Sequence, residues 1–267
     1  MKNRLVMIIV VILAAGLITS SIRLFQVSNS LKDAHTQTAN LKQDMSTMAT
    51  TITGLQTQVS STSTSIQGLV SAVADVVAKV EPAMVRVDVT LTNAMVSGSG
   101  SIIDQRGFVL TNYHVIDGAE SIKVTVMKTG VFDGTVVAGD KARDLALVSI
   151  TSNRTDFPTV TLGTAADIVV GEDVMAVGFP LGTELTGPAT LTKGIVSAMR
   201  VLADGLNYIQ TDATINPGNS GGCLFTLDGK MIGIPSAVIV PQNEDIEGLG
   251  LAIPIDDILA FIQKNLK

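Results

Sequence analysis

The sequence predicts an all-β protein, either a barrel or a sandwich, that follows a long N-terminal segment of helical pattern. Short runs in which apolar and polar residues alternate recur after Pro82, with the period of two that is typical of half-buried strands. Turn dipeptides lie between several runs: Asp117-Gly118, Asp133-Gly134 and Asp228-Gly229. A helical pattern returns only in the final sequence IDDILAFIQKNLK.

Composition limits the classes to which the chain can belong. It has 267 residues, of which 46% are hydrophobic and 3% are aromatic, and it contains no Trp. Such a core must be built from Val, Ile, Leu and Ala, which suits many short strands. The formal net charge of −6 argues against a nucleic-acid-binding surface, because that surface needs a basic patch. Two His and one Cys are too few for a His/Cys zinc site, and we expect no cofactor.

The first segment, residues 1–23, has the pattern of a membrane anchor. Lys2 and Arg4 precede an apolar run over residues 5–22, whose 18 residues would rise about 27 Å as a helix and just span a bilayer core. Because basic residues stay in the cytoplasm, we expect the rest of the chain in the periplasm or outside the cell. The alternative is a signal peptide that is removed by cleavage.

Residues 24–65 begin a seven-residue apolar repeat that continues to Val80. The repeat predicts a helical coiled-coil stalk that associates chains, and Pro82 should end the helix. Residues 45–65 contain 12 Ser or Thr among 21 positions, which favours a flexible tether as the alternative. The residue types at the repeat positions favour two strands. These positions, the seam, are Leu24, Val27, Leu31, Ala34, Thr38, Leu41, Met45, Met48, Ile52, Leu55, Val59, Thr62, Ile66, Leu69, Val73, Val76 and Val80.

Three residues in the strand-rich region have the types and the chain order of a nucleophilic serine site. His114 lies in TNYHVIDG, Asp144 precedes LALVSI, and Ser220 lies in INPGNSGGCLF. Each alone would be an ordinary structural residue, but together they supply base, orienting acid and nucleophile in the order His, Asp, Ser. A serine hydroxyl needs an adjacent imidazole to take its proton during attack, and an acid fixes the tautomer of that imidazole.

The glycines beside Ser220 fit a second requirement of this chemistry. Attack on a carbonyl produces an oxyanion, which needs preorganised hydrogen-bond donors. The backbone N–H groups of Gly218 and Ser220 can converge on one point because Gly218, Gly221 and Gly222 leave the turn uncrowded. An esterase of the α/β-hydrolase type is excluded, since it needs Gly-x-Ser-x-Gly and a His that comes last in the chain.

From residue 66 to about residue 254, the chain resembles the protease domain of the HtrA (high-temperature-requirement) family of trypsin-like serine proteases. The matching stretches include GSGSIIDQRGFVLTNYHV, TLTKGIVSAM and IQTDATINPGNSGGCLF. The resemblance implies two six-stranded antiparallel β-barrels of the trypsin/chymotrypsin type, with the active site between them, and assembly as a homotrimer. It assigns catalysis to His114, Asp144 and Ser220, and the oxyanion hole to Gly218 and Ser220.

The resemblance also sets expectations for domain organisation. The PDZ domain that typically follows in this family is not expected here, and neither is control through it. Cys223 stands where the family often has proline, and we expect a small buried apolar residue there rather than a reactive thiol. The expected divisions are anchor or signal 1–23, stalk 24–65 and protease domain 66–267, with barrel 1 at about 83–155, barrel 2 at about 160–254 and a C-terminal helix at 255–266.

Substrate preference is indicated only by the resemblance. Thr214 would lie near the floor of the pocket for the residue before the cleaved bond, and without an acid there we expect small or medium aliphatic residues rather than Lys or Arg. An extended substrate would pair with residues 236–238 as an added strand, which suits unfolded or exposed protein segments and protein quality control or regulated cleavage. The alternative is a catalytically silent scaffold or chaperone. Further substrate-binding positions are Ser236, Ala237, Val238, Gly248 and Leu251.

Overall fold

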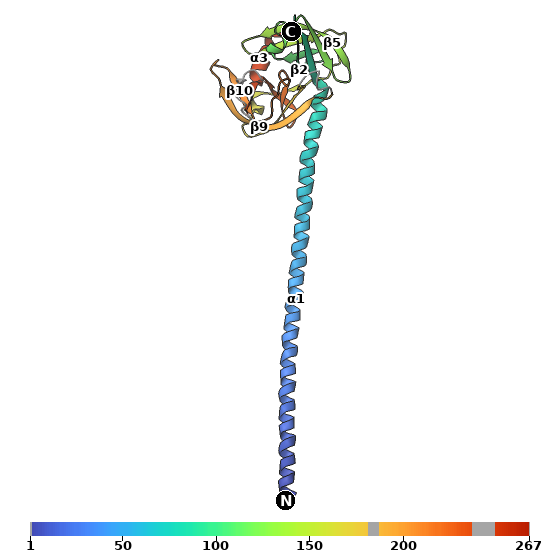
Figure 1. The fold of residues 1–267 in the computed structure, drawn as a ribbon, viewed down its shortest axis with the longest axis vertical. Helices are drawn as coiled ribbons and strands as arrows, with labels where there is room; N and C mark the ends of the chain where they lie inside the picture. The colour runs from blue at the N-terminus through green and yellow to red at the C-terminus, as the bar shows by residue number, and fades with distance from the viewer. Residues whose placement is uncertain (1, 181–186, 237–248, 267) are drawn as a thin grey trace. The chain divides into compact units, whose positions relative to one another are not determined.

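The computed structural model describes residues 2–180, 187–236 and 249–266. The chain divides into two compact units, Met1–Gly68 and Leu69–Lys267. The first unit is part of a single helix, α1 (Lys2–Val80), and the second contains the described strands (Figure 1).

α1 continues without a break through the Ser/Thr-rich stretch, so the prediction of a helix is confirmed and the flexible tether is wrong over this length. Threonine hydroxyls on α1 bond back to carbonyls one turn earlier, as Thr50 Oγ1 does to Ser46 O at 3.0 Å. These bonds satisfy the hydroxyls on the helix itself. After Val80 a 3₁₀ turn, η1 (Glu81–Ala83), contains Pro82, whose ring cannot continue a helix.

Barrel 1 is a closed ring of six antiparallel strands in the order β1-β2-β3-β6-β5-β4. Valines in its strands alternate with polar residues and fill the interior, so that Val85, Val87 and Val89 are all 0% exposed. A short helix, α2 (Tyr113–Ile116), follows the third strand. The strands are β1 (Met84–Thr90), β2 (Met95–Asp104), β3 (Phe108–Thr111), β4 (Ser121–Val126), β5 (Gly130–Asp140) and β6 (Leu145–Ile150).

One predicted turn in this barrel is wrong. Asp133 and Gly134 lie inside β5, where they pair with Lys123 and Ile122 of β4. Asp133 Oδ1 forms an ion pair with Lys123 Nζ at 2.6 Å, and this cross-strand contact stabilises the strand pair. A Cβ at Gly134 would lie 2.9 Å from Val148 Cγ1. Gly134 is therefore explained by the crowded barrel interior and not by a turn.

Barrel 2 closes because β11 pairs with both β8 and β12, which makes a ring of six antiparallel strands. The prediction of two six-stranded barrels is thus confirmed. A two-residue strand, β7, extends the sheet by pairing parallel to β12. The strands are β7 (Thr161–Leu162), β8 (Asp173–Gly178), β9 (Thr190–Val201), β10 (Asn207–Thr211), β11 (Cys223–Thr226), β12 (Lys230–Pro235) and β13 (Gly250–Pro254), with η2 (Ala165–Asp167) after β7.

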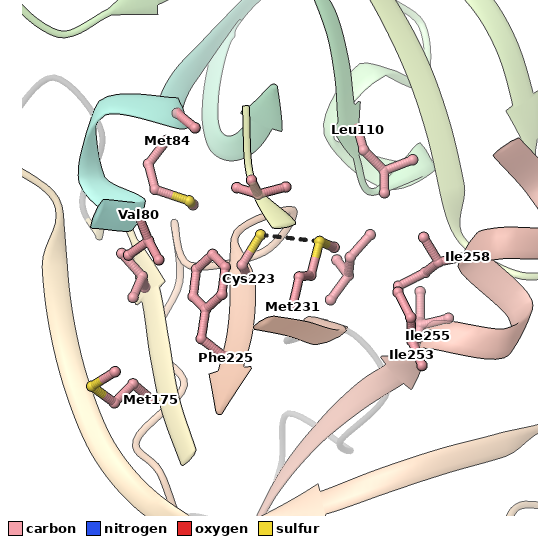
Figure 2. Close-up of a cluster of buried hydrophobic side chains, with 14 of the residues drawn as sticks. Val80, Met84, Leu110, Met175, Cys223, Phe225, Met231, Ile253, Ile255 and Ile258 are labelled. Atoms are coloured by element: carbon pink, nitrogen blue, oxygen red, sulfur yellow. Dashed lines mark hydrogen bonds between the residues drawn. The ribbon is translucent and has the colours of Figure 1, made fainter. Parts of the chain in front are cut away.

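The two barrels and the C-terminal helix, α3 (Ile255–Asn265), share one buried apolar cluster. Figure 2 shows Leu110 of barrel 1 on one side of this cluster and Cys223, Phe225 and Met231 of barrel 2 within it. Ile258 of α3 joins the cluster from its buried face. Each large apolar side chain buried here contributes about 1.5–3 kcal/mol. This shared core fixes the barrels against each other and thereby positions the site between them.

Candidate active site

His114 lies on α2, directly after β3 of barrel 1. Val115 and Ile116, its neighbours on this short helix, are buried in the barrel core, while the His114 side chain keeps 30% exposure. Asn112, which precedes α2, is fully buried and donates from Nδ2 to the carbonyl of Asp144 at 2.9 Å. This bond ties the His114 segment to the segment that precedes β6.

Asp144 binds His114 through both its backbone and its ring. The His114 N–H donates to Asp144 Oδ1 at 2.9 Å, and His114 Nδ1 lies 2.8 Å from Asp144 Oδ2. Because a carboxylate only accepts hydrogen bonds, the proton of the neutral imidazole lies on Nδ1, and Nε2 is left as the basic nitrogen. The pair therefore has the geometry of a general base and its orienting acid.

Two further features distinguish Asp144, its backbone conformation and a second hydrogen bond to its carboxylate. Asp144 has a φ of 54°, a left-handed conformation that is uncommon for a residue other than glycine. The hydroxyl of Ser236, which is fully buried, donates to Asp144 Oδ2 at 2.8 Å. The carboxylate thus receives donors from His114 and from Ser236, on opposite barrels. The sequence predicts Ser236 only as a substrate-binding residue, and this contact with Asp144 was not predicted from it.

Ser220 lies in the turn between β10 and β11 of barrel 2 and is 5% exposed. The turn is closed by two backbone bonds at 2.9 Å, Asn219 N–H to Asn216 O and Gly222 N–H to Asn219 O. A Cβ at Gly221 would lie 2.2 Å from the Ser99 carbonyl oxygen of barrel 1. Glycine is required there because the turn packs directly against a strand of the other barrel.

The turn of Ser220 and the helix of His114 pack on the same residue of β2, Gly98. A Cβ at Gly98 would lie 2.7 Å from Val115 Cγ1 and 3.3 Å from the Ser220 carbonyl oxygen. The close approach of both segments needs a residue without a side chain. The structure therefore brings Asp144 into contact with His114, and it brings the Ser220 turn against the strand that supports the residue after His114.

The expected substrate-pocket residues fall partly in the described chain. Thr214 is exposed, and its carbonyl accepts a bond from Thr192 Oγ1 at 2.8 Å. A Cβ at Gly250, next to Leu251, would lie 2.6 Å from Ile215 Cδ1, so the Thr214 segment runs beside β13. Leu251 is buried. The other expected positions, Ala237, Val238 and Gly248, lie outside the described residues.

Within the described ranges, no group of three or more His, Cys, Asp or Glu side chains could hold a metal ion. Cys223 is fully buried on β11, with its Sγ 3.5 Å from Met231 Sδ. Burial raises the pKa of its thiol to about 12. The expectation of a small buried residue at this position agrees with this environment.

Comparisons with known proteins place this site in a family context. Residues 98–234 match the model of the trypsin-like peptidase domain. The chain is 43% identical over 176 residues to a putative serine protease, HhoA, of Synechocystis sp.. This match covers 63% of this chain and 42% of the relative. The chain is 40% identical over 166 residues to a probable periplasmic DegP-like serine endoprotease of Hahella chejuensis, with 61% and 34% covered.

A similar solved structure is that of the HtrA-type protease AlgW with a tripeptide. It is 36% identical, covers 72% of this chain and 62% of that chain, and superposes with a TM-score of 0.64. The chain spans about two fifths or less of the length of the curated relatives named above.

Proposed function

Because this chain belongs to the trypsin-like peptidase family and is similar to DegP-like and HtrA-type serine proteases, we propose that it is a serine endopeptidase. The observation that carries the proposal is the contact of 2.8 Å between Asp144 Oδ2 and His114 Nδ1. An imidazole held by a carboxylate in this way is suited to remove a proton from a hydroxyl nucleophile.

In the proposed reaction, Ser220 Oγ attacks the carbonyl carbon of the cleaved peptide bond while its proton passes to Nε2 of His114. The carbonyl becomes an oxyanion, which the backbone N–H groups of Gly218 and Ser220 stabilise. The imidazolium is stabilised by Asp144 and returns its proton to the leaving amine, so that an ester of Ser220 remains. Water, deprotonated by His114, then hydrolyses this ester and regenerates the hydroxyl.

Proposed substrates are unfolded or exposed protein segments with a small or medium aliphatic residue before the cleaved bond. Thr214 carries no charge that would attract Lys or Arg. An extended segment would pair along residues 236–238 as an added strand, with further contacts from Gly248 and Leu251. A cleavage profile dominated by basic residues would contradict this preference. Such substrates fit a role in extracytoplasmic protein quality control or regulated cleavage.

α1 contains one stretch, within Val6–Thr64, that is long and apolar enough to cross a membrane, with a mean hydropathy of 2.3. A signal sequence would have the same properties, and we propose that this segment is an uncleaved single-pass anchor. Lys2 and Arg4 would then stay in the cytoplasm, with the protease domain on the opposite side.

The seam residues from Leu24 to Ile66 are exposed in the single chain, with Leu31 at 67% and Leu55 at 56%, whereas Val76 and Val80 are buried in the apolar cluster of the second unit. Burial of such a stripe between chains is the driving force of a coiled coil. We propose that three copies of α1 associate through the seam and hold the protein as a homotrimer.

Proteolysis by the full-length protein tests the proposed activity. The detergent-solubilised chain should digest casein, and Ser220→Ala should lose this digestion while keeping the same thermal unfolding. If Ser220→Ala and wild type digest casein equally, the endopeptidase assignment to this site is wrong.

A further inference from the structure

Ser99, in the middle of β2, is a buried polar residue without a role in the proposed chemistry. It is 0% exposed. Its hydroxyl donates to the carbonyl of Gly218 at 2.6 Å and accepts from the N–H of Phe179 at 2.7 Å. Ser99 belongs to barrel 1, whereas Gly218 and Phe179 belong to barrel 2. One hydroxyl therefore joins three segments across the boundary between the barrels.

The backbone of Ser99 reinforces this link. Its N–H donates to the carbonyl of Ser220 at 2.9 Å, and its own carbonyl accepts from the Thr111 hydroxyl at 2.7 Å. Ser99 thus holds the carbonyls of both Gly218 and Ser220, the two residues whose N–H groups form the proposed oxyanion hole.

A peptide group is planar, so a bond to its carbonyl also fixes the N–H at its other end. The group that joins Gly218 to Asn219 is held at its carbonyl by the Ser99 hydroxyl and at its N–H by Asn216 O, at 2.9 Å. The group that joins Ser220 to Gly221 is likewise held at both ends, by the Ser99 N–H and, at 3.3 Å, by the carbonyl of Pro235. The two held groups lie on either side of the group that joins Asn219 to Ser220, whose N–H is one of the proposed oxyanion donors.

The hydroxyl bond matters most at Gly218, whose φ is 97°. Glycine has no Cβ and therefore rotates more freely than other residues, so Gly218 cannot orient its own N–H through local sterics. A partner from outside the turn must do so. The Ser99 hydroxyl is that partner on the carbonyl side.

We propose that Ser99 is a positioning residue for the oxyanion hole. Its hydroxyl holds the Gly218 carbonyl and thereby restrains the Gly218–Asn219 peptide group, which connects the two proposed donors, the N–H groups of Gly218 and Ser220. The inference rests on the proposed function. Ser99 touches no reacting atom, so its effect must appear in transition-state stabilisation and not in the binding of the ground-state peptide.

Ser101 offers a matched control two residues further along β2. It is also fully buried, and its hydroxyl lies 4.0 Å from Met231 Sδ. The kinetics of peptide hydrolysis are measured with the full-length protein. Ser99→Ala should lower kcat by about 10- to 100-fold, which is somewhat less than the effect of losing a direct oxyanion donor. The variant should change KM by less than about twofold. Ser101→Ala should keep both kcat and KM.

A peptidyl boronic acid supplies a readout that a merely structural role would not change. Its tetrahedral adduct with Ser220 places a negatively charged oxygen where the oxyanion forms. Ser99→Ala should bind this inhibitor about 10- to 100-fold more weakly than wild type, while its affinity for the cleaved peptide product remains unchanged.

In case Ser99→Ala does not fold, a second pair of variants, Ser99→Thr and Ser99→Val, compares side chains of the same shape with and without the hydroxyl. Threonine and valine have the same shape, so Ser99→Thr and Ser99→Val crowd the site equally. Ser99→Thr should retain at least about tenfold more activity and boronate affinity than Ser99→Val. The inference about Ser99 alone would be overturned by either of two results with an active wild type. One is equal activity and boronate affinity in Ser99→Thr and Ser99→Val, and the other is a kcat of Ser99→Ala equal to that of Ser101→Ala. A wild type that neither cleaves peptide nor binds the boronate would overturn the proposed function as well.

Discussion

The guanidinium of Arg143 forms an ion pair with the carboxylate of Asp257, which joins the turn before β6 to the first turn of α3. The backbone N–H of Arg143 also donates to Asp140 Oδ1 at 3.0 Å. The next residue is Asp144, in its left-handed conformation. The C-terminal helix of the chain therefore restrains the segment that presents the acid to His114.

Arg143→Met should lower activity more than it lowers stability. The pair is partly exposed, with Arg143 at 40% and Asp257 at 22%, so its loss should cost less than about 1 kcal/mol in unfolding free energy. The freed turn should lower kcat by about 3- to 10-fold, equivalent to about 0.7–1.4 kcal/mol. Peptide hydrolysis and urea unfolding measure the two effects.

Arg154→Met is the matched control for this prediction. Arg154 pairs with Asp156 at 2.9 Å on the surface of the same barrel, away from Asp144 in the chain. Its kcat should equal that of wild type. If both variants lose activity to the same extent, the tie between α3 and the Asp144 turn has no functional effect.

Two glycines with left-handed backbones, Gly221 and Gly205, allow the cost of a steric clash to be measured apart from the cost of the backbone conformation. Gly221 has a φ of 81°, and a Cβ there would lie 2.2 Å from Ser99 O; Gly205 has a φ of 76° and nothing within 4 Å. Gly205→Ala should cost about 1–2 kcal/mol from its conformation alone. Gly221→Ala should cost more than about 4 kcal/mol or prevent folding. Similar costs in urea unfolding would show that the turn does not pack closely on β2.

Cys223 should be inert in the folded protein. Only the thiolate reacts with disulfide reagents, and burial raises the pKa of this thiol to about 12. At pH 8 a chromogenic disulfide should therefore label the native protein far more slowly than a free thiol, and urea should restore one rapid equivalent. Rapid labelling of the native chain, with its unfolding transition intact, would mean that Cys223 is accessible.

The seam on α1 should determine the assembly. Leu41→Glu together with Leu55→Glu places charges on the seam, and Gln43→Glu together with Gln58→Glu places the same charges outside it. In sedimentation of the full-length chain in detergent, wild type and the Gln pair should have the mass of three chains, and the Leu pair a lower mass. A wild type of two chains would contradict the trimer, and a monomer would contradict association.

The fold was largely predictable because its signals are local. The alternation at Val85, Val87 and Val89 predicts a strand from adjacent residues alone. β2, by contrast, has the sequence MVSGSGSIID, whose first half carries no alternation. Gly98 makes room for the His114 helix of its own barrel and for the Ser220 turn of the opposite barrel, and a Cβ at Gly100 would lie 2.6 Å from Val109 Cγ1. These requirements come from residues on other elements of the chain and leave no mark in neighbouring residues.

The catalytic residues of the candidate site could be predicted from the sequence, but the residues that hold them in position could not. His114, Asp144 and Ser220 lie in distinctive motifs. Ser99 contacts a residue 119 positions away, and Ser236 contacts one 92 positions away. A serine inside a strand has no local signal for such a contact, since only the closure and docking of the barrels bring these hydroxyls to their partners.

The location of a covalent label tests the central claim most directly. A fluorophosphonate reacts with a serine only where a base activates its hydroxyl. After reaction of the full-length protein, peptide mapping by mass spectrometry should find one phosphonylated residue, Ser220, and the label should be lost in both Ser220→Ala and His114→Ala. An unlabelled wild type, or labelling of Ser220 at the same rate in His114→Ala, would contradict the proposed mechanism.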